Sequence, residues 1–357
     1  MQISTALAPG SQCTDSLSQN PLSPCFPPPP EPQGSTLGTQ VGSSCYGGVA
    51  DDALKDEDNA GWVLDLAPAV QAAWLQRIRW LRLVDRLAEQ ALIQADPTRF
   101  TRFLAGWQQL KIQGTPPPAH PDRPLLEELR QAWFGQHGQR FDAPAIAAWE
   151  RYLTTIHRYH QPGLVFTTLA EYETFLVDMG GGFFQVFPFV AAHQRAAIAY
   201  WGRLDQIYNQ LRDLQEDLQQ GLCYFPTQVL AQFGLHREAL LDPAQRTAAP
   251  YQHLMQFWVD KYLPRLRRKA RQIARHTDLH PSWAIFLEWS IARYRRIETT
   301  LRECAFDYER FTAVYWPRVQ AELPQLRSQV QTLSPQTTAT RPVVLHAPTI
   351  SRMTTNA

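Results

Sequence analysis

The sequence has few cysteines, almost no net charge and no long apolar run, and each of these absences excludes a class of protein. The five cysteines among 357 residues show neither the spacing of a metal site nor a plausible disulfide framework, which favours a reducing compartment. A formal net charge of +1 gives no overall reason to expect nucleic acid as a partner. No apolar run reaches the roughly 18–20 residues that cross a bilayer, and no signal-peptide pattern is present. We therefore expect a cytoplasmic protein that binds no nucleic acid.

Alternating strands and internal repeats are also missing, whereas helical periodicity extends through most of the chain. The exceptions are residues 1–60, rich in Ser, Pro and Gly, and residues 334–357, rich in Thr and Pro; we expect both to be disordered. With 44% hydrophobic residues, the chain can bury a core. The sequence predicts an all-α fold with one domain over residues 61–333. Helices are predicted at residues 66–93, 97–112, 122–134, 143–160, 169–187, 191–219, 226–232, 242–276, 281–304 and 307–332.

One predicted helix carries oxygen-bearing side chains along a single face. Gln206, Asn209, Asp213 and Asp217 recur at steps of three, four and four residues, which stacks them on a helix of 3.6 residues per turn. Two aspartates four residues apart repel each other by roughly 0.2–0.5 kcal/mol. Amide and carboxylate oxygens are the ligands that hard cations such as Mg²⁺ accept. A solvated acidic face is the alternative for the aspartates alone; the two preceding amides favour a cation site.

The same segment resembles a known motif. It reads QIYNQLRDLQED over residues 206–217, followed by Gly221, Tyr224 and Pro226. This order is similar to the second aspartate-rich motif of the squalene/phytoene synthase family, the head-to-head prenyl synthases. The family usually has an Arg two residues before the Tyr, where this chain has Leu222. The resemblance implies an isoprenoid-synthase-like helical bundle around a central cavity.

A second acidic pair on the first long predicted helix could face the first one. Residues 82–89 read RLVDRLAE and resemble the family's first motif, R-x-x-D-D-x-x-D. Arg82, Asp85 and Glu89 fill its first, second and last charged places, whereas Arg86 stands where the family has its middle aspartate. A self-paired surface set of alternating charges is the alternative.

Two other family elements match only in part. Phe175 falls where the family has a tyrosine, and three glycines, Gly180 to Gly182, follow it. Because glycine in a helix costs up to about 1 kcal/mol relative to Ala, we expect that space is needed there, either for a prenyl chain or for close helix packing. Residues 65–68, DLAP, are similar to the end of the family's first helix, but the Ser-x-x-Phe element expected before them is not found.

These resemblances imply an Mg²⁺-dependent prenyl transferase, with Mn²⁺ as an alternative ion. It would join two C15 or C20 prenyl diphosphates in carotenoid or triterpenoid biosynthesis, and it would need NADPH only for a squalene-type product. The implied catalytic residues are Asp85, Glu89, Asp213 and Asp217, which with Asn209 would also bind the metal. The implied substrate-binding residues are Arg82, Gln206, Asn209, Arg212, Tyr224, Phe175 and Gly181.

Two alternative functions remain open from the sequence. The chain could be an inactive relative that binds prenyl lipids or acts in assembly, as the departures at Arg86 and Phe175 and the missing Ser-x-x-Phe element favour. It could also be a head-to-tail or cyclising terpene synthase on the same fold. A basic stretch at residues 265–275 could be a solvated face, a diphosphate-capture surface or a contact with anionic lipid at the membrane periphery. His157 and His160, three residues apart, are interpreted as a surface pair because no third ligand is near in the sequence.

Overall fold

The computed structural model describes residues 61–93, 98–134, 142–161, 163–242, 244–275 and 278–338. The N-terminal segment predicted to be disordered lies outside these residues, as does the C-terminal one except for residues 334–338. Those five residues continue the last helix, which therefore extends beyond its predicted end.

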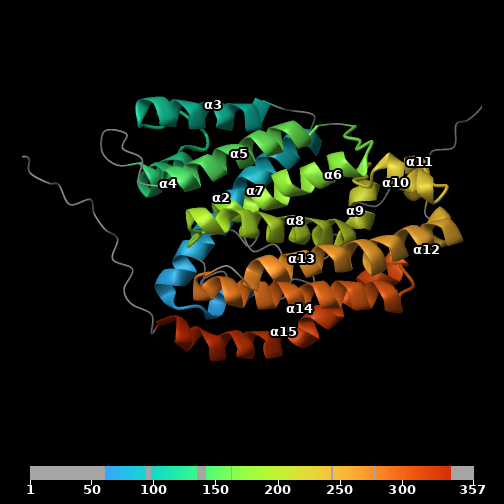
Figure 1. Cartoon of the computed structure of the whole chain (residues 1–357). Helices are drawn as coiled ribbons and strands as arrows, with labels where there is room; N and C mark the ends of the chain where they lie inside the picture. The colour runs from blue at the N-terminus through green and yellow to red at the C-terminus, as the bar shows by residue number, and fades with distance from the viewer. Residues whose placement is uncertain are drawn as a thin grey trace, which may run out of the picture. The chain divides into compact units, whose positions relative to one another are not determined.

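Every regular element in these ranges is helical and none is a strand, which confirms the predicted all-α fold (Figure 1). None of the described helices combines the length and the apolar character that crossing a bilayer requires. In chain order the elements are η3 (Gly61–Asp65), α2 (Pro68–Ile93), α3 (Thr98–Gln113), α4 (Arg123–Trp133), α5 (Ala143–Tyr159), α6 (Leu169–Leu176), η5 (Val177–Gly181), α7 (Gly182–Val186), η6 (Ala192–Gln194), α8 (Arg195–Arg212), α9 (Leu214–Gln219), α10 (Thr227–Gln232), α11 (Arg237–Leu241), η7 (Gln245–Thr247), α12 (Ala249–Gln256), η8 (Phe257–Tyr262), α13 (Leu263–Arg275), α14 (Pro281–Glu303) and α15 (Tyr308–Thr338).

Helix α8 is central to the packing, because η5, α7, α13 and α14 all contact it (Figure 1). Two glycines approach each other closely: a Cβ on Gly180 of η5 would overlap the backbone carbonyl of Gly202 on α8. A Cβ on Gly181 would come within 2.9 Å of the carbonyl oxygen of Ala199. The glycine run therefore serves close helix packing at these two positions, one of the two explanations that the sequence leaves open.

Between α6 and α7 the chain forms a π-helical turn, η5, within an otherwise continuous helical segment. Such turns insert an extra residue into a helix and are frequent at functional sites. Here the turn brings Met179 and Gly180 to the wall of an internal cavity.

The short element η3 is fixed by both apolar and ionic contacts. Trp62 packs on Trp74 of α2, with ring centroids 4.8 Å apart, and on Phe286 of α14 at 5.2 Å. The Asp65 carboxylate accepts hydrogen bonds from both sides of the Arg327 guanidinium, at 2.8 and 3.0 Å. This aspartate of the DLAP segment thus holds η3 against α15.

The predicted helix boundaries need three corrections. The helix predicted over residues 191–219 is interrupted at Asp213, which ends α8 and precedes α9. The one predicted to begin at residue 242 has only the short element η7 before α12 starts at Ala249, where Pro250 in the first turn favours a helix start. The short helix α11 was not predicted, because five residues are too few to show a period.

Candidate active site

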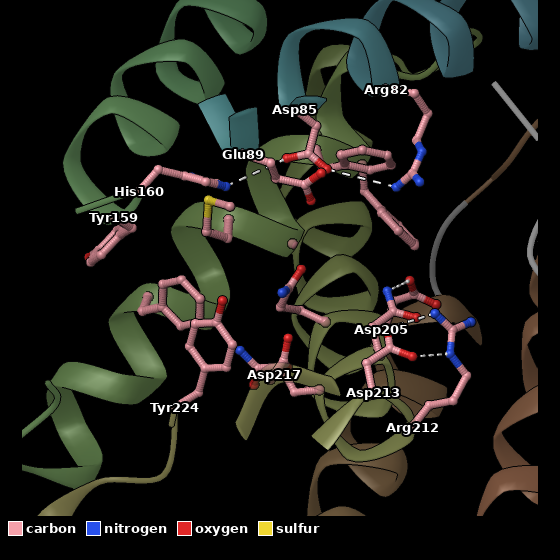
Figure 2. Close-up of a pocket in the computed structure, with 18 of the residues that line it drawn as sticks. Arg82, Asp85, Glu89, Tyr159, His160, Asp205, Arg212, Asp213, Asp217 and Tyr224 are labelled. Atoms are coloured by element: carbon pink, nitrogen blue, oxygen red, sulfur yellow. Dashed lines mark hydrogen bonds and ion pairs between the residues drawn. The ribbon is translucent and has the colours of Figure 1, made fainter. Parts of the chain in front are cut away.

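The described helices enclose a cavity of about 470 Å³, a size typical of small-molecule sites. Part of its wall is acidic, from α2 on one side and from α8 and α9 on the other (Figure 2). Another part is aromatic and includes Phe183, Phe184, Phe187, Phe286 and Trp62, whose rings touch one another. The cavity therefore offers a polar and an apolar surface to the same ligand.

The acidic face of α8 stays aligned through the interruption at Asp213. The backbone N–H of Asp213 donates to the carbonyl of Asn209 at 2.8 Å, and that of Asp217 donates to the carbonyl of Asp213 at 2.9 Å. The helical hydrogen bonds therefore continue, and the three side chains remain stacked, one turn apart, along the cavity.

Gly221 forms the turn that follows the acidic residues of the motif. Its φ of +74° lies in the left-handed region, and the N–H of Leu222 donates to the carbonyl of Asp217 at 2.8 Å. Together with the bond from Gly221 to Leu218 at 3.0 Å, this is a Schellman cap. The cap reverses the chain one turn after Asp217, so that Tyr224 returns to line the same cavity.

On the opposite side, Asp85 of α2 is surrounded by polar groups. The Tyr152 hydroxyl donates to Asp85 Oδ1 at 3.4 Å, Arg82 Nη1 lies 3.8 Å from Oδ2, and His160 Nε2 lies 4.0 Å from Oδ1. Glu89, one turn further along α2, is exposed and lines the cavity beside it (Figure 2). These contacts orient Asp85 toward the ligand space.

The carboxylates of α2 interact electrostatically with those at the end of α8 and in α9, across the cavity. Burial, followed by the charges of Asp213 and Glu216, raises the pKa of Asp217 from 3.8 to about 8, and Glu89 from the facing helix adds to this rise. Burial also raises the pKa of Tyr224, with further contributions from Asp217 and from Asp85 across the cavity. So many carboxylates sharing one partly buried space form a site of high negative potential, which a cation would relieve.

The donor set suits Mg²⁺ shared with a phosphate ligand. Among the described residues, no three carboxylate, His or Cys side chains are close enough to form a complete metal cage. Mg²⁺ is usually bound through one or two carboxylates plus substrate phosphates, not through an all-protein cage. Two carboxylates on each side of the cavity fit that requirement.

The arginines near the site differ in the groups that they contact. Arg212 forms a bidentate pair with Asp213, at 2.6 and 2.8 Å. Arg293 of α14, only 3% exposed, pairs with Asp205 and donates to Asn209 Oδ1 at 2.9 Å. Arg86, the departure in the first motif, is not among the residues that line the cavity; its Nε donates to the backbone carbonyl of Arg82 at 3.4 Å. The substituted cation therefore does not occupy the ligand space.

Of the residues predicted for the site, the structure brings all but Gly181 to the cavity wall, where its neighbour Gly180 is found instead. Phe175 stacks parallel to Tyr224, with ring centroids 5.6 Å apart. Tyr208 of α8 does not line the cavity, and its hydroxyl donates to Glu298 at 2.5 Å. The catalytic, substrate-binding and metal-binding roles of the predicted residues remain predictions.

Several polar residues that line the cavity were not predicted for the site, and His160, Asp205 and Arg293 are among them. His160, interpreted as part of a surface pair, lines the cavity beside Asp85. Asp205 and Arg293 also line it and pair with each other. Asp205 directly precedes the motif, so its position was a usable signal, whereas no local pattern indicated that Arg293, 88 residues later, would reach the same place.

The comparisons with known proteins agree with this geometry. Residues 63–320 match the squalene/phytoene synthase family, and no curated protein matches the chain. A crystal structure of a dehydrosqualene synthase in complex with a ligand is 14% identical, with a TM-score of 0.56 over 81% of this chain and 96% of that one. Squalene synthase HpnC from Alicyclobacillus acidocaldarius is 15% identical, with a TM-score of 0.53 over 74% of this chain and 95% of that one. At these identities the two structures show the fold, and the match over most of the described residues shows that the chain belongs to the squalene/phytoene synthase family.

Proposed function

We propose that this protein is a prenyl transferase that joins two prenyl diphosphates of 15 or 20 carbons head to head and releases diphosphate. The observation that carries the proposal is the pair of acidic groups, Asp85 with Glu89 and Asp213 with Asp217, facing one cavity that is also lined by aromatic rings. The acidic groups suit a metal–diphosphate head group, and the rings suit a prenyl chain. The family's carotenoid and triterpenoid pathways are the setting that we infer for the product.

The chain's own residues would act mainly by binding and orienting the substrates. Asp85, Glu89, Asp213 and Asp217 would hold Mg²⁺, or Mn²⁺ in its place, with Asn209 as a neutral oxygen ligand. Such ions neutralise the diphosphate and make it a better leaving group. Arg82, Gln206, Arg212 and Tyr224 lie where they can contact phosphate oxygens, and a guanidinium can do so bidentately.

The aromatic wall would protect the reactive intermediate. When the allylic C–O bond breaks, its electron pair leaves with the diphosphate and an allylic cation remains. Ring faces such as those of Phe175 and Phe183 stabilise a cation without attacking it, and they exclude water from it. The double bond of the second prenyl diphosphate then forms the new C–C bond, and loss of a proton gives a cyclopropylcarbinyl diphosphate. A phytoene-type product follows by loss of its diphosphate and a further proton, and a squalene-type product by loss of diphosphate and hydride transfer from NADPH.

Substitution of the second acidic pair tests the proposal. Asp213→Ala and Asp217→Ala should each lower product formation from farnesyl or geranylgeranyl diphosphate with Mg²⁺ by about 100-fold or more, because each removes a carboxylate that holds the metal. Glu309→Gln, at an exposed carboxylate on α15, is the matched control and should retain full activity. Wild-type turnover in both aspartate variants would refute the proposed site, and product mass would separate head-to-head from cyclised products.

A second function is binding of a prenyl lipid without turnover. It is favoured by Phe175 in place of the family's tyrosine, and by the engagement of Arg212 with Asp213 and of Arg293 with Asp205. Incubation of the purified protein with labelled diphosphates, Mg²⁺ and NADPH separates the two functions. Release of diphosphate supports the transferase, whereas saturable binding with no release supports the lipid-binding relative.

A further inference from the structure

We propose that a second site, on the face of α8 away from the cavity, binds a phosphate group. A small hollow lies there among α8, α13 and α14. Its volume of about 10 Å³ is close to that of one water-sized group, so one phosphate oxygen would enter it while the others stay at its mouth. The residues that line it are Trp201, Leu204, Arg267, Arg271, Ile291, Tyr294 and Arg295.

Three arginines from two helices line this hollow. Arg271 of α13 and Arg295 of α14 are both exposed, and among the described residues neither has an ion-pair partner. Arginine is the side chain best suited to phosphate, because its fork of N–H donors matches the phosphate oxygens. Two guanidinium groups without partners, on different helices at one hollow, are therefore available to bind an anion.

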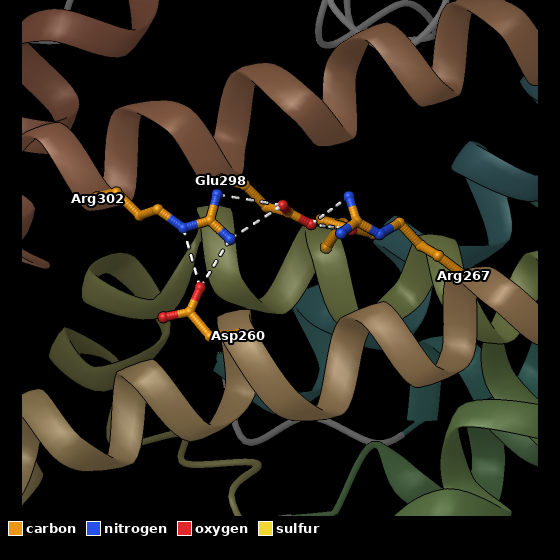
Figure 3. Close-up of polar contacts among 5 residues, drawn as sticks. Asp260, Arg267, Glu298 and Arg302 are labelled. Carbon is orange, nitrogen blue, oxygen red and sulfur yellow. Dashed lines mark hydrogen bonds and ion pairs between the residues drawn. The ribbon is translucent and has the colours of Figure 1, made fainter.

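The third guanidinium is held in place by a fixed network. Arg267 Nη1 lies 2.8 Å from Oε1 of Glu298, and Glu298, only 4% exposed, also accepts from the Tyr208 hydroxyl at 2.5 Å. Arg302 approaches the other carboxylate oxygen of Glu298 at 3.4 Å and pairs with Asp260 at 2.8 Å (Figure 3). Because Glu298 is held from several sides, Arg267 is oriented before any ligand arrives, which lowers the cost of ordering it.

The indole of Trp201 offers one more hydrogen-bond donor at the hollow. Trp201 is 3% exposed and lines the hollow, and its Nε1–H has no hydrogen-bond partner among the described residues. Four other buried indoles, those of Trp107, Trp133, Trp149 and Trp258, also have no acceptor among the described residues, so Trp201 matters here because of its place in the wall of the hollow. An anion oxygen seated in the hollow would bring an acceptor to this tryptophan.

The hollow is separate from the candidate active site but shares a residue with its polar network. Tyr294 lines the hollow, and its hydroxyl donates at 2.7 Å to Asp205, which lines the cavity. The cavity is rich in carboxylates and, without metal, repels anions, so phosphate binding measured in EDTA reports on the hollow. That measurement therefore does not depend on whether the protein is a transferase.

Two sources of the phosphate group are consistent with this chemistry. Arg268 and Lys269 are exposed on the same helix α13 and extend the positive surface beside the hollow. Such a surface suits a lipid headgroup in an anionic membrane, and the hollow alone suits a free phosphate. The shared ligand is the phosphate group itself.

The experiment compares two charge-matched double variants, with folding checked by circular dichroism. Arg271→Gln/Arg295→Gln removes two groups at the hollow, whereas Arg268→Gln/Lys269→Gln removes two charges beside it. Binding of inorganic phosphate is measured calorimetrically in EDTA, and binding to phosphatidylglycerol/phosphatidylcholine vesicles by flotation, with phosphatidylcholine vesicles alone as the blank. The hollow variant should lose affinity by about tenfold or more, and the neighbouring variant by less than about threefold.

The outcomes separate the ligand sources and can overturn the proposal. Vesicle binding that free phosphate displaces supports a site for the phosphate group as such, and vesicle binding that it does not displace supports a lipid headgroup. Binding of free phosphate alone supports a soluble ligand. Equal losses in the two double variants would show diffuse attraction to α13 and no site, and wild-type protein that binds neither probe would refute the proposal. Trp201→Phe, which keeps an aromatic ring and removes the N–H, should weaken binding as well.

Discussion

The acidic cavity predicts that the metal-free protein becomes less stable as the pH rises, and Asp217 is the residue responsible. Its pKa is raised from 3.8 to about 8, first by burial and then by Asp213 and Glu216. Between these two pH values the folded protein binds more protons than the unfolded chain does. Raising the pH therefore favours unfolding. The contribution of Asp217 to the free energy of unfolding is fully present below pH 3.8 and is lost as the pH rises through about 8.

The size of the effect follows from the same shift. Each pH unit between the folded and unfolded pKa values lowers the free energy of unfolding by up to about 1.4 kcal/mol. From about pH 5.5 to about pH 7.5 the fall is about 2 kcal/mol, after allowance for the partial exposure of Asp217. For a domain of this size, that corresponds to a decrease in melting temperature of roughly 4–8 °C.

Thermal unfolding followed by circular dichroism in EDTA at the two pH values measures this decrease. Asp217→Asn cannot ionise, so the difference between wild type and this variant isolates the contribution of the one carboxyl group. Glu216→Gln is the matched control: it removes the same charge from an exposed position and leaves the burial of Asp217 unchanged, so most of the decrease should persist.

Two results would refute this reasoning. The first is a melting temperature that falls equally in the wild type and in Asp217→Asn, since Asp217 would then not be the titrating group. The second is a Glu216→Gln variant that abolishes the decrease, because the raised pKa would then depend on neighbouring charge and not on burial. Mg²⁺ together with inorganic pyrophosphate should restore stability at the higher pH, since ligands of the folded state stabilise it.

Two further predictions follow from backbone packing and from the direction of one side chain. Gly180→Ala should lower the free energy of unfolding by about 1–3 kcal/mol in denaturant titrations, because its Cβ would overlap the Gly202 carbonyl. Gly182→Ala is the control: the nearest contact of its Cβ is 3.8 Å away, so the loss should be less than about 0.5 kcal/mol. Equal losses in the two variants would contradict the close crossing of η5 and α8. Arg86→Asp should change turnover in steady-state assays by less than about threefold, since Arg86 does not line the cavity. Asp85→Asn should reduce turnover about 100-fold. A large effect of Arg86→Asp would show that this side chain belongs to the site.

Most of the fold and much of the site could be predicted because the informative patterns are local. The helical spacing of Asn209, Asp213 and Asp217 depends only on the geometry of one helix, and that geometry continues through the interruption at Asp213. The contact between Asp205 and Arg293 joins α8 to α14, and no local period indicates which residues of two distant helices meet. Only the packing of α14 against α8 brings them together.

The departure at Arg86 shows that a residue's position around its helix decides whether a change in a motif reaches the site. Successive residues of an α-helix are separated by roughly 100° around its axis. Glu89, four residues from Asp85, therefore lies back on the same side, whereas Arg86, one residue away, points about a quarter turn aside. The structure agrees, because Asp85 and Glu89 line the cavity and Arg86 does not. The substitution at Arg86 is consequently weak support for an inactive relative, and the departures at Phe175 and Leu222, which do line the cavity, bear more directly on the chemistry.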